Sequence, residues 1–276
     1  MPKFDGQVVI ITGGSDGIGF AVAERFVTQG ARVVIVARTM SRLEAAAEAL
    51  RELGGEVLPI SMDVSDLNAC QSLVKRTVEH YGALHGLVNN AALHHRGAFT
   101  THAASDLVQM VQVNLSAPIY LTRSCVPHLV DTSGFVVNIA SLAGCVPTPG
   151  SSVYSATKFG LRALSRALAE ELRSTGVRVS VVSPGPVDTA FIMDNLDSVT
   201  DLTLSQPVLS ADTIAEAVLR SAEDGALERK LPARSGVLAT AAYLVPSLAR
   251  KIRPLLERKG RKKRLALLAS RQSSHP

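Results

Sequence analysis

Two residues four positions apart could carry out proton transfer. Tyr154 and Lys158 stand at the start of a long helical pattern, so their side chains share one face of that helix. A phenol ordinarily titrates near ~10, and a unit charge ~4 Å away contributes at most about 4 kcal/mol at an effective dielectric of about 20. The ammonium of Lys158 is therefore predicted to lower the pKa of Tyr154 toward neutral pH, as a general acid requires. Alone, the pair also fits an ordinary helix surface.

A glycine-rich segment near the start of the chain fits a phosphate-binding turn. It follows an apolar strand pattern and opens a helical pattern, with the sequence Thr12-Gly13-Gly14-Ser15-Asp16-Gly17-Ile18-Gly19. Glycine permits positive φ and close backbone approach, and a helix N-terminus offers free N–H groups to a pyrophosphate. The residues expected to bind a dinucleotide here are Gly13, Ser15, Asp16, Gly17, Ile18 and Gly19. A purely structural turn is the alternative.

The end of the second predicted strand indicates which dinucleotide is preferred. An acidic side chain that binds the ribose hydroxyls of NAD usually stands there, whereas this chain has Ala37 and Arg38. A guanidinium can pair with a 2′-phosphate, so NADP(H) is favoured, the alternative being that Arg38 is a solvated charge. Asp63 and Val64 follow the third strand and are expected at the adenine edge.

Val/Ile-rich runs alternate with segments of helical periodicity over the first 183 residues. The predicted strands are 7–12, 32–37, 56–60, 86–89, 134–140 and 177–183. The helical segments between them are 18–29, 40–53, 66–81, 104–128 and 151–174, and a further short helix is expected near 211–223. This alternation predicts an α/β fold, a doubly wound parallel sheet (Rossmann fold) with helices on both faces.

The order and spacing of these motifs resemble the short-chain dehydrogenase/reductase family over about residues 5–225. The shared pattern is Thr12-Gly-x-x-x-Gly17-x-Gly19, Asn89-Asn90-Ala91, Asn114, Ser141, Tyr154-x-x-x-Lys158 and Pro184-Gly185. The resemblance implies a catalytic tetrad of Asn114, Ser141, Tyr154 and Lys158. It also implies cofactor contacts from Asn90, Ala91, Tyr154, Lys158, Pro184, Gly185, Val187 and Thr189, with Thr189 at the nicotinamide carboxamide. The family usually has Gly at position 92, so Ala92 indicates a different local loop.

In the reduction that these residues would support, each member of the tetrad has a distinct role. Tyr154 donates its proton to the substrate oxygen as hydride reaches the carbon, and Ser141 hydrogen-bonds that oxygen. Lys158 lowers the pKa of Tyr154 and also holds the nicotinamide ribose. Asn114 is a mediocre helix residue, which favours a role in ordering a water behind Lys158.

Bulk composition limits the class of protein. The 276 residues are 46% hydrophobic, enough for one large domain, and three cysteines without a CxxC pair indicate reduced thiols and a cytoplasmic location. The N-terminus shows no signal-peptide pattern, and no apolar run reaches the ~20 residues of a bilayer span. His94 and His95 lack a carboxylate or cysteine at ligand spacing, so no metal site is predicted, and a loop at the substrate mouth is favoured.

The C-terminal part differs from the rest of the chain. We expect a catalytic domain over 1–234, with a substrate lid at about 189–210, and an amphipathic, basic extension over 235–276. Residues 250–276 contain ten Lys or Arg and one Asp or Glu, whereas the whole chain has a net charge of +5, so residues 1–249 are net acidic. Pro246 and Pro254 are expected to interrupt or kink the helix. The extension could contact anionic lipid, pack on the core or a partner subunit, or stay partly disordered. Nucleic-acid binding is disfavoured, because the basic run lacks aromatic residues.

These features together predict an NADP(H)-dependent carbonyl reductase or dehydrogenase. Apolar residues in the lid and near Ser141 favour a hydrophobic ketone, aldehyde or secondary alcohol as substrate. The resemblance further implies a homo-oligomer associated through the long helices. The alternatives are an NAD(H)-dependent alcohol dehydrogenase of the same fold and a nucleotide-binding redox sensor without turnover.

Overall fold

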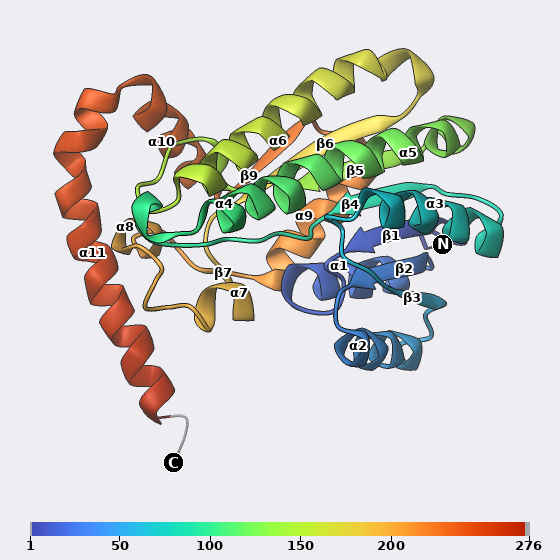
Figure 1. Cartoon of the computed structure of the whole chain (residues 1–276), viewed down its shortest axis with the longest axis horizontal. Helices are drawn as coiled ribbons and strands as arrows, with labels where there is room; N and C mark the ends of the chain where they lie inside the picture. Colours follow the sequence, from blue (N-terminus) through green and yellow to red (C-terminus); the bar gives the residue numbers. More distant parts are fainter. Residues whose placement is uncertain (1, 274–276) are drawn as a thin grey trace.

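Seven strands form one parallel sheet in the computed structural model, which describes residues 2–273 (Figure 1). Their order in the sheet is β3-β2-β1-β4-β5-β6-β9, so the direction of crossover reverses between β1 and β4. The strands are β1 (Val8–Thr12), β2 (Arg32–Ala37), β3 (Val57–Ser61), β4 (Gly86–Asn89), β5 (Phe135–Ile139), β6 (Arg178–Pro184) and β9 (Glu228–Leu231). A small second sheet pairs β7 (Val187–Asp188) with β8 (Leu209–Ser210). The prediction of a doubly wound parallel sheet is confirmed.

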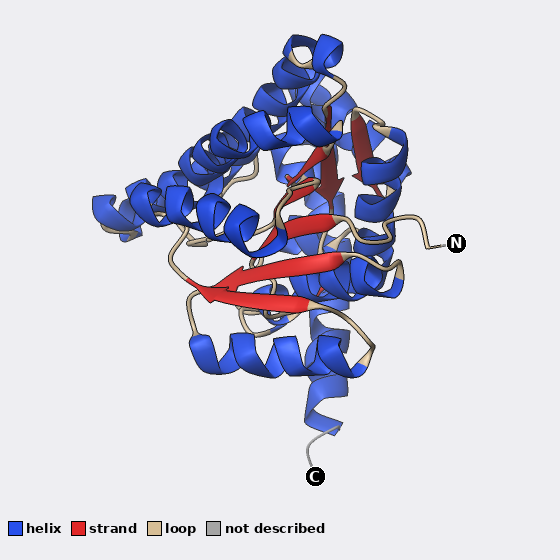
Figure 2. Cartoon of the chain, turned by 90° about the vertical axis from the view of Figure 1, so that its right-hand side faces the viewer, coloured by secondary structure: helices blue, strands red, loops and turns tan. Residues whose placement is uncertain are grey.

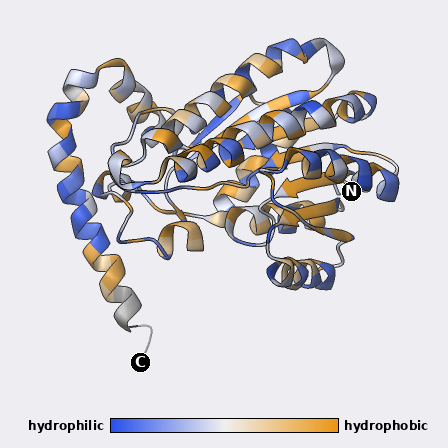
Figure 3. Ribbon diagram, in the orientation of Figure 1, coloured by the Kyte–Doolittle hydropathy of each residue, from blue (hydrophilic) through white to orange (hydrophobic). Residues whose placement is uncertain are grey.

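Helices cover both faces of this sheet (Figure 2). One face packs against α1 (Gly17–Thr28), α2 (Met40–Glu52) and α9 (Ala211–Asp224), and the other against α3 (Leu67–Tyr81), α5 (Ala117–Thr132) and α6 (Ser152–Glu171). Each face of the sheet has its own hydrophobic core, and alternate residues of β1 belong to opposite cores. Val9 and Ile11 pack in the core beneath α1, while Val8 and Ile10 pack in the core beneath α3 and α5. The central strands β1, β4 and β5 are therefore buried at every position and mostly apolar, as the hydropathy colouring shows for β1 (Figure 3).

The structure adds one strand to the six that were predicted for the main sheet. β9 reads Glu-Arg-Lys-Leu, a charged sequence that gives no apolar strand signal, and it forms the edge of the sheet beside β6. Its pairing joins Val181 to Glu228 and Pro184 to Leu231. An edge strand needs little apolar surface, so the hydrophobic pattern could not reveal it.

The helix expected over 104–128 is divided into three parts. α4 (Ala104–Val111) passes through a π-helical turn, Gln112–Ser116, into α5, which extends to Thr132. Asn114 lies in that turn. Single π-helical turns interrupt the regular hydrogen-bond ladder and often occur at functional sites. The remaining short elements are the 3-10 turns Phe99–Thr101, Leu142–Gly144 and Arg173–Thr175 and the helices α7 (Ala190–Met193) and α8 (Asp201–Leu204).

The C-terminal extension forms two helices, α10 (Ala233–Leu244) and α11 (Pro246–Ser273). Pro246 is the first residue of α11, where its missing N–H costs nothing, but the helix continues through Pro254, so the interruption expected there is wrong. Residues 274–276 of the predicted extension lie outside the described residues. Among residues 2–273, no helix has the length and apolar character needed to cross a bilayer.

α11 packs on α8 through its basic segment. The Arg264 side chain donates to the carbonyls of Leu196 (2.8 Å) and Val199 and pairs with Asp201 (3.0 Å), and Lys263 donates to the carbonyl of Gln206 (2.8 Å). Part of the basic run therefore neutralises and caps the lid of the same chain. The extension therefore packs on its own chain, but through its basic run, whereas the predicted contact was through its apolar residues.

We expect Gly260→Ala to loosen this contact. Alanine would ordinarily stabilise a helix interior by about 1 kcal/mol, but here its Cβ would overlap the carbonyl oxygen of Asp201, and such overpacking costs about 1–3 kcal/mol. Hydrogen exchange should become faster in α11 and in residues 196–206. Ala266→Leu, on the exposed side of α11, is the control and should leave exchange unchanged. Unaltered exchange in Gly260→Ala would contradict this seating of α11.

Candidate active site

A cavity of about 1390 Å³ lies at the carboxyl ends of the strands, where open α/β sheets bind ligands. Residues that follow six of the parallel strands line it, and α10 and α11 close its far side. The predicted site residues that line the cavity are Gly13, Ser15, Asp16, Gly17, Ile18, Arg38, Asp63, Val64, Asn90, Ala91, Ser141, Tyr154, Lys158, Pro184, Gly185, Val187 and Thr189. Gly19 and Asn114 lie behind this wall.

The glycine-rich turn is held open by contacts that only glycine allows. Gly17 adopts φ +53°, and a Cβ there would lie 3.1 Å from Cγ2 of Thr189. A Cβ at Gly13 would lie 2.8 Å from the Asn90 amide nitrogen, which donates to the carbonyls of Thr12 (2.9 Å) and Gly13 (3.2 Å). Gly19 lets α1 pack on the carbonyl of Gly13. The turn leaves room at the helix N-terminus and fits a dinucleotide pyrophosphate.

Cationic and acidic side chains meet at the adenosine end of the cavity. Arg38 and Arg42 line it beyond the end of β2, and the serine hydroxyl of Ser61 donates to the carbonyl of Arg38 (3.0 Å). The pKa of Asp63 is lowered: burial opposes the shift, but hydrogen bonds from Ser65 and the charge of Arg38 outweigh it. Asp63 is therefore an anionic hydrogen-bond acceptor beside the site expected for adenine.

The proposed proton donor is buried at the N-terminal end of α6. Tyr154 is 8% exposed and Lys158 2% exposed, and the Ser141 hydroxyl is hydrogen-bonded to the phenol of Tyr154. The Lys158 ammonium donates to the carbonyl of Ile139 at the end of β5 (2.8 Å) and lies 5.7 Å from the centroid of the Tyr154 ring. Tyr154, Ser141 and Lys158 therefore converge on one point of the cavity.

The electrostatics differ from the prediction for the tyrosine and lysine pair. Burial raises the pKa of Tyr154, and the groups that oppose this shift are Arg96 and the Ser141 hydrogen bond. Burial also lowers the pKa of Lys158 to about 8. The prediction that Lys158 depresses the pKa of Tyr154 is wrong for this structure, because burial dominates, the Lys158 ammonium is directed at Ile139, and the cation that opposes the shift is Arg96.

Asn114 supports the site from behind. Its side-chain oxygen accepts from the backbone N–H of Leu93 (2.8 Å), and its amide donates to the Leu93 carbonyl (2.8 Å) and to Thr157 (3.3 Å). Asn114 thus joins the loop after β4 to α6. The role in ordering a water behind Lys158 stays a prediction. Ala92 does not have a positive φ, so the loop accepts its Cβ without the strain that the family's glycine would avoid.

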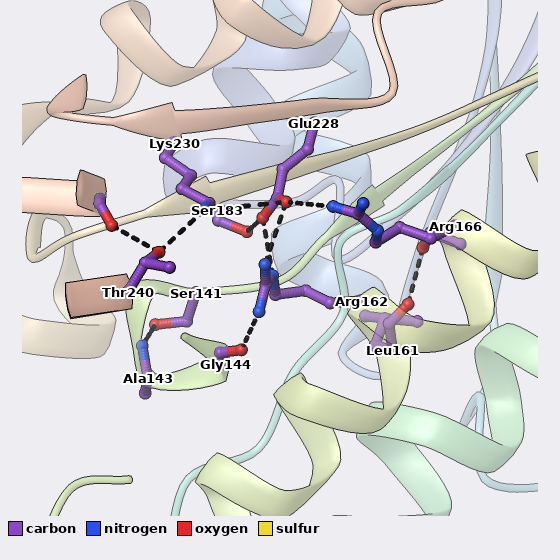
Figure 4. Close-up of polar contacts among 12 residues, drawn as sticks. Ser141, Ala143, Gly144, Leu161, Arg162, Arg166, Ser183, Glu228, Lys230 and Thr240 are labelled. Carbon is purple, nitrogen blue, oxygen red and sulfur yellow. Dashed lines mark hydrogen bonds and ion pairs between the residues drawn. The ribbon is translucent and has the colours of Figure 1, made fainter. Parts of the chain in front are cut away.

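A buried ion pair fixes α6 against the loop that carries Ser141 (Figure 4). The Arg162 side chain pairs with Glu228 of β9 (2.7 Å) and donates to the carbonyl of Gly144. Glu228 also accepts from Ser183 (3.4 Å) and is only 8% exposed. A Cβ at Gly144 would lie 2.6 Å from the Lys158 carbonyl. Nothing in the sequence motifs marked Arg162 or Glu228 as part of the site.

The loop after β4 contributes two residues to the cavity wall that the sequence motifs did not assign to the site, His94 and Arg96. His94 stacks on the ring of Tyr154 with centroids 3.8 Å apart, and its Nε2 is 3.0 Å from the Ser151 hydroxyl. Burial, with Arg96 and Lys158 nearby, lowers the pKa of His94 to about 2, so its ring is neutral. His94 lines the cavity, and the prediction that its loop lies at the substrate mouth stays a prediction. In the sequence, the only sign that His94 belongs to the site was an aromatic ring three residues after the Asn89-Asn90-Ala91 motif.

The three cysteines are free and buried. Cys145 packs with Leu142 and Ala239, and burial raises the pKa of Cys70 to about 11. Over residues 2–273, no cluster of three or more His, Cys, Asp or Glu side chains could hold a metal ion.

The sheet, the glycine turn at the switch point and the Tyr154/Lys158 pair together define a Rossmann-type oxidoreductase. The family model described as short chain dehydrogenase matches residues 7–199. Dehydrogenase LinX from Sphingobium indicum, which acts on 2,5-dichloro-2,5-cyclohexadiene-1,4-diol, is 37% identical, with 68% of this chain and 75% of that protein covered. Ketoacyl reductase HetN of a Nostoc strain is 34% identical, with 79% of this chain and 77% of that protein covered.

A solved structure agrees with these comparisons. A short chain dehydrogenase from Burkholderia cenocepacia in complex with NADP superposes with a TM-score of 0.76 at 30% identity, covering 83% of this chain and 97% of that one. The chain belongs to the short-chain dehydrogenase family and is an oxidoreductase that acts on an alcohol or carbonyl group.

Tyr154→Phe should lower turnover by about 10²–10⁴, the usual contribution of a general acid. The aromatic ring remains, so its stacking on His94 and the binding of the nicotinamide cofactor should persist. Steady-state rates with a carbonyl panel, together with cofactor titration, measure the two effects separately. Tyr120→Phe, outside the cavity, is the control. Full activity of Tyr154→Phe would exclude Tyr154 as the acid.

The two reaction directions should respond differently to pH. Because burial raises the pKa of Tyr154 above its ordinary value near ~10, the phenol stays protonated at neutral pH. The kcat for carbonyl reduction should therefore be flat between about pH 6 and 7.5, whereas kcat for alcohol oxidation, which needs the phenolate, should rise with pH. His94, with its pKa near 2, should add no inflection. Oxidation that reaches its plateau below about pH 7 would disprove a raised Tyr154 pKa.

Proposed function

We propose that this enzyme transfers a hydride between NADP(H) and a hydrophobic ketone, aldehyde or secondary alcohol. The observation that carries the cofactor preference is the end of β2, where Ala37 provides no carboxylate and Arg38 and Arg42 line the cavity. A 2′-phosphate could accept charge-assisted hydrogen bonds from both guanidinium groups. The Burkholderia relative, solved with NADP, supports the same preference.

NADP(H), when bound, supplies the hydride, and the chain's own residues supply the proton and the geometry. Tyr154 donates its phenolic proton to the substrate oxygen, and Ser141 hydrogen-bonds the same oxygen and stabilises its developing charge. Lys158 and Thr189 would hold the nicotinamide half of the cofactor, and Asp63 and Val64 the adenine. His94 packs on one face of the Tyr154 ring and restricts the donor to one orientation.

The apolar substrate class is supported by the cavity wall beyond Ser141. Its apolar side chains come from the Ser141 loop, the lid and the two C-terminal helices: Leu142, Val146, Phe191, Ile192, Val199, Leu202, Leu238, Ile252 and Leu256. Relatives named for acting on a chlorinated cyclic diol, on a ketoacyl group and on an 11-beta-hydroxysteroid are consistent with a bulky apolar substrate. An NAD(H)-dependent alcohol dehydrogenase of the same fold is the competing function.

Association and location form part of the same proposal. Val108, Ile119 and Val130 are exposed on α4 and α5, which supports a homo-oligomer formed through the long helices. Leu255 and Leu265 are exposed on α11 among basic residues, which supports peripheral contact of a cytoplasmic enzyme with anionic lipid. The division into a catalytic domain over 1–234 and an extension over 235–276 also stays a proposal.

Arg38→Leu should weaken NADPH binding by about 10- to 100-fold, because charge-assisted hydrogen bonds are worth about 1.5–3 kcal/mol. The affinity for NADH should change little. The chain has no tryptophan, so the emission of the reduced nicotinamide can be titrated directly. Arg76→Leu, an exposed arginine on α3, is the matched control. Equal affinity of the wild type for NADPH and NADH would refute the NADP(H) preference.

A further inference from the structure

Arg96 lies beside the proposed proton donor without an acidic partner. Its guanidinium carbon is 4.8 Å above the ring centroid of Phe191, which lies in α7. The Arg96 side chain lines the cavity. Phe191 in turn lies 6.3 Å from His94, which stacks on Tyr154. Arg96 is therefore held at the reaction centre by aromatic contacts rather than by an ion pair.

The cations in this part of the cavity are not balanced by acids. Within the part of the chain that the structure describes, Arg96 forms no ion pair, and the charge interaction found for it is with the Tyr154 phenol. Asp16 and Asp63 are the acidic side chains in the cavity wall, and both belong to the cofactor end. Lys158 is directed at the Ile139 carbonyl and Arg253 is paired with Glu257 (2.7 Å).

A half-buried guanidinium without a partner is costly, and burial lowers the pKa of Arg96. A bound carboxylate would remove that cost and could accept two parallel hydrogen bonds from the planar guanidinium. The Phe191 ring fixes one face of the guanidinium and leaves its edge for such a contact.

We infer that Arg96 binds an anionic group of the substrate, a carboxylate or its equivalent, within a few bonds of the carbonyl that Tyr154 protonates. The inference rests on the proposed hydride transfer and narrows its substrate class to an amphipathic anion. The apolar body occupies the wall formed by Leu142, Val146 and Ile192, and the charged end faces Arg96. An oxo acid with an apolar chain has this chemistry.

The structure also offers a different role for Arg96, which is to tune Tyr154. In that case its removal would reduce turnover of neutral and anionic substrates alike and would shift the pH profile of kcat. The anion-binding role instead predicts a loss confined to anionic substrates. The two roles are therefore separable by comparing matched charged and neutral probes.

The first experiment measures binding without turnover. Decanoate and decanamide, neither of which can give up a hydride from a carbinol carbon, are titrated calorimetrically into the full-length protein saturated with NADP+, so the phosphate-binding arginines are already occupied. Wild type should bind decanoate at least about tenfold more tightly than the neutral decanamide, and Arg96→Met should abolish that difference. Arg123→Met, an exposed arginine outside the cavity, should retain it.

Every other pattern overturns the inference. Equal affinity for both probes, or no binding of either, would mean that the cavity does not select anions. A decanoate preference that survives in Arg96→Met would place the anion at Arg250 or Lys259 on α11 instead. Equal weakening of both probes in Arg96→Met would mean a packing role. NADPH affinity, measured on the same samples, tests the proposed function separately.

The second experiment follows catalysis. The kcat/KM for 2-oxodecanoate, divided by that for its methyl ester, should fall at least about tenfold in Arg96→Met, be partly restored in Arg96→Lys, and stay constant in Arg123→Met. A ratio that does not change, with both rates reduced and the pH profile shifted, would assign Arg96 to tuning of Tyr154 and overturn the inference. Absence of any turnover in wild type, with the decanoate preference intact, would count against the proposed reaction only.

Discussion

Arg162 and Glu228 form the contact on which the geometry of the site depends. Arg162 lies one helical turn after Lys158 on α6, and its guanidinium reaches both the edge strand β9 and the carbonyl of Gly144 in the Ser141 loop (Figure 4). Glu228 also pairs with Arg166 (3.3 Å) and Lys230 (4.0 Å), so loss of Arg162 would leave its charge partly compensated. Loss of Glu228, by contrast, would leave the largely buried Arg162 without an acidic partner. The pair therefore fixes α6, which carries Tyr154, relative to the loop that carries Ser141, and it ties the edge strand β9 to both.

Two sides of the cavity are held by different contacts: the side formed by α6 and the Ser141 loop is packed rigidly, and the side formed by the loop after β4 is held more loosely. On the fixed side, Gly144 lies so close to the backbone of Lys158 that no larger residue fits, and the buried cores clamp α6 to the sheet. On the other side, Asn114 holds the loop after β4 only through the backbone of Leu93, so the residues beyond it can vary without disturbing the sheet. His94 and Arg96 stand on that loop. The proposed catalytic residues Ser141, Tyr154 and Lys158 thus lie on the rigid side, and Arg96, proposed to bind the substrate anion, lies on the loop side.

The sequence predicted the parts whose signals are local. Glycine positions, continuous apolar strands and the four-residue spacing of Tyr154 and Lys158 depend on neighbouring residues, and the fold that they predicted is confirmed. The missed parts depend on tertiary contacts. β9 is charged because Glu228 faces Arg162, α11 continues through Pro254 because it packs on α8, and burial outweighs Lys158 at the Tyr154 phenol. The spacing of two residues on a helix predicts that their side chains are close, but it does not predict how deeply they are buried, and here burial determines the direction of the Tyr154 pKa shift.

Part of the basic C-terminal segment makes its contacts within the same chain. Arg264 donates hydrogen bonds to the backbone carbonyls of Leu196 and Val199, which lie outside regular secondary structure. Asp201 of α8 pairs with the Arg264 guanidinium. α11 thereby holds the lid from outside while its inner face, with Ile252 and Leu256, completes the cavity. The family motifs end near residue 199, so the wall that contacts the distal part of a substrate is built largely beyond them. The substrate specificity proposed for this chain would therefore depend in part on residues outside the match to the family model.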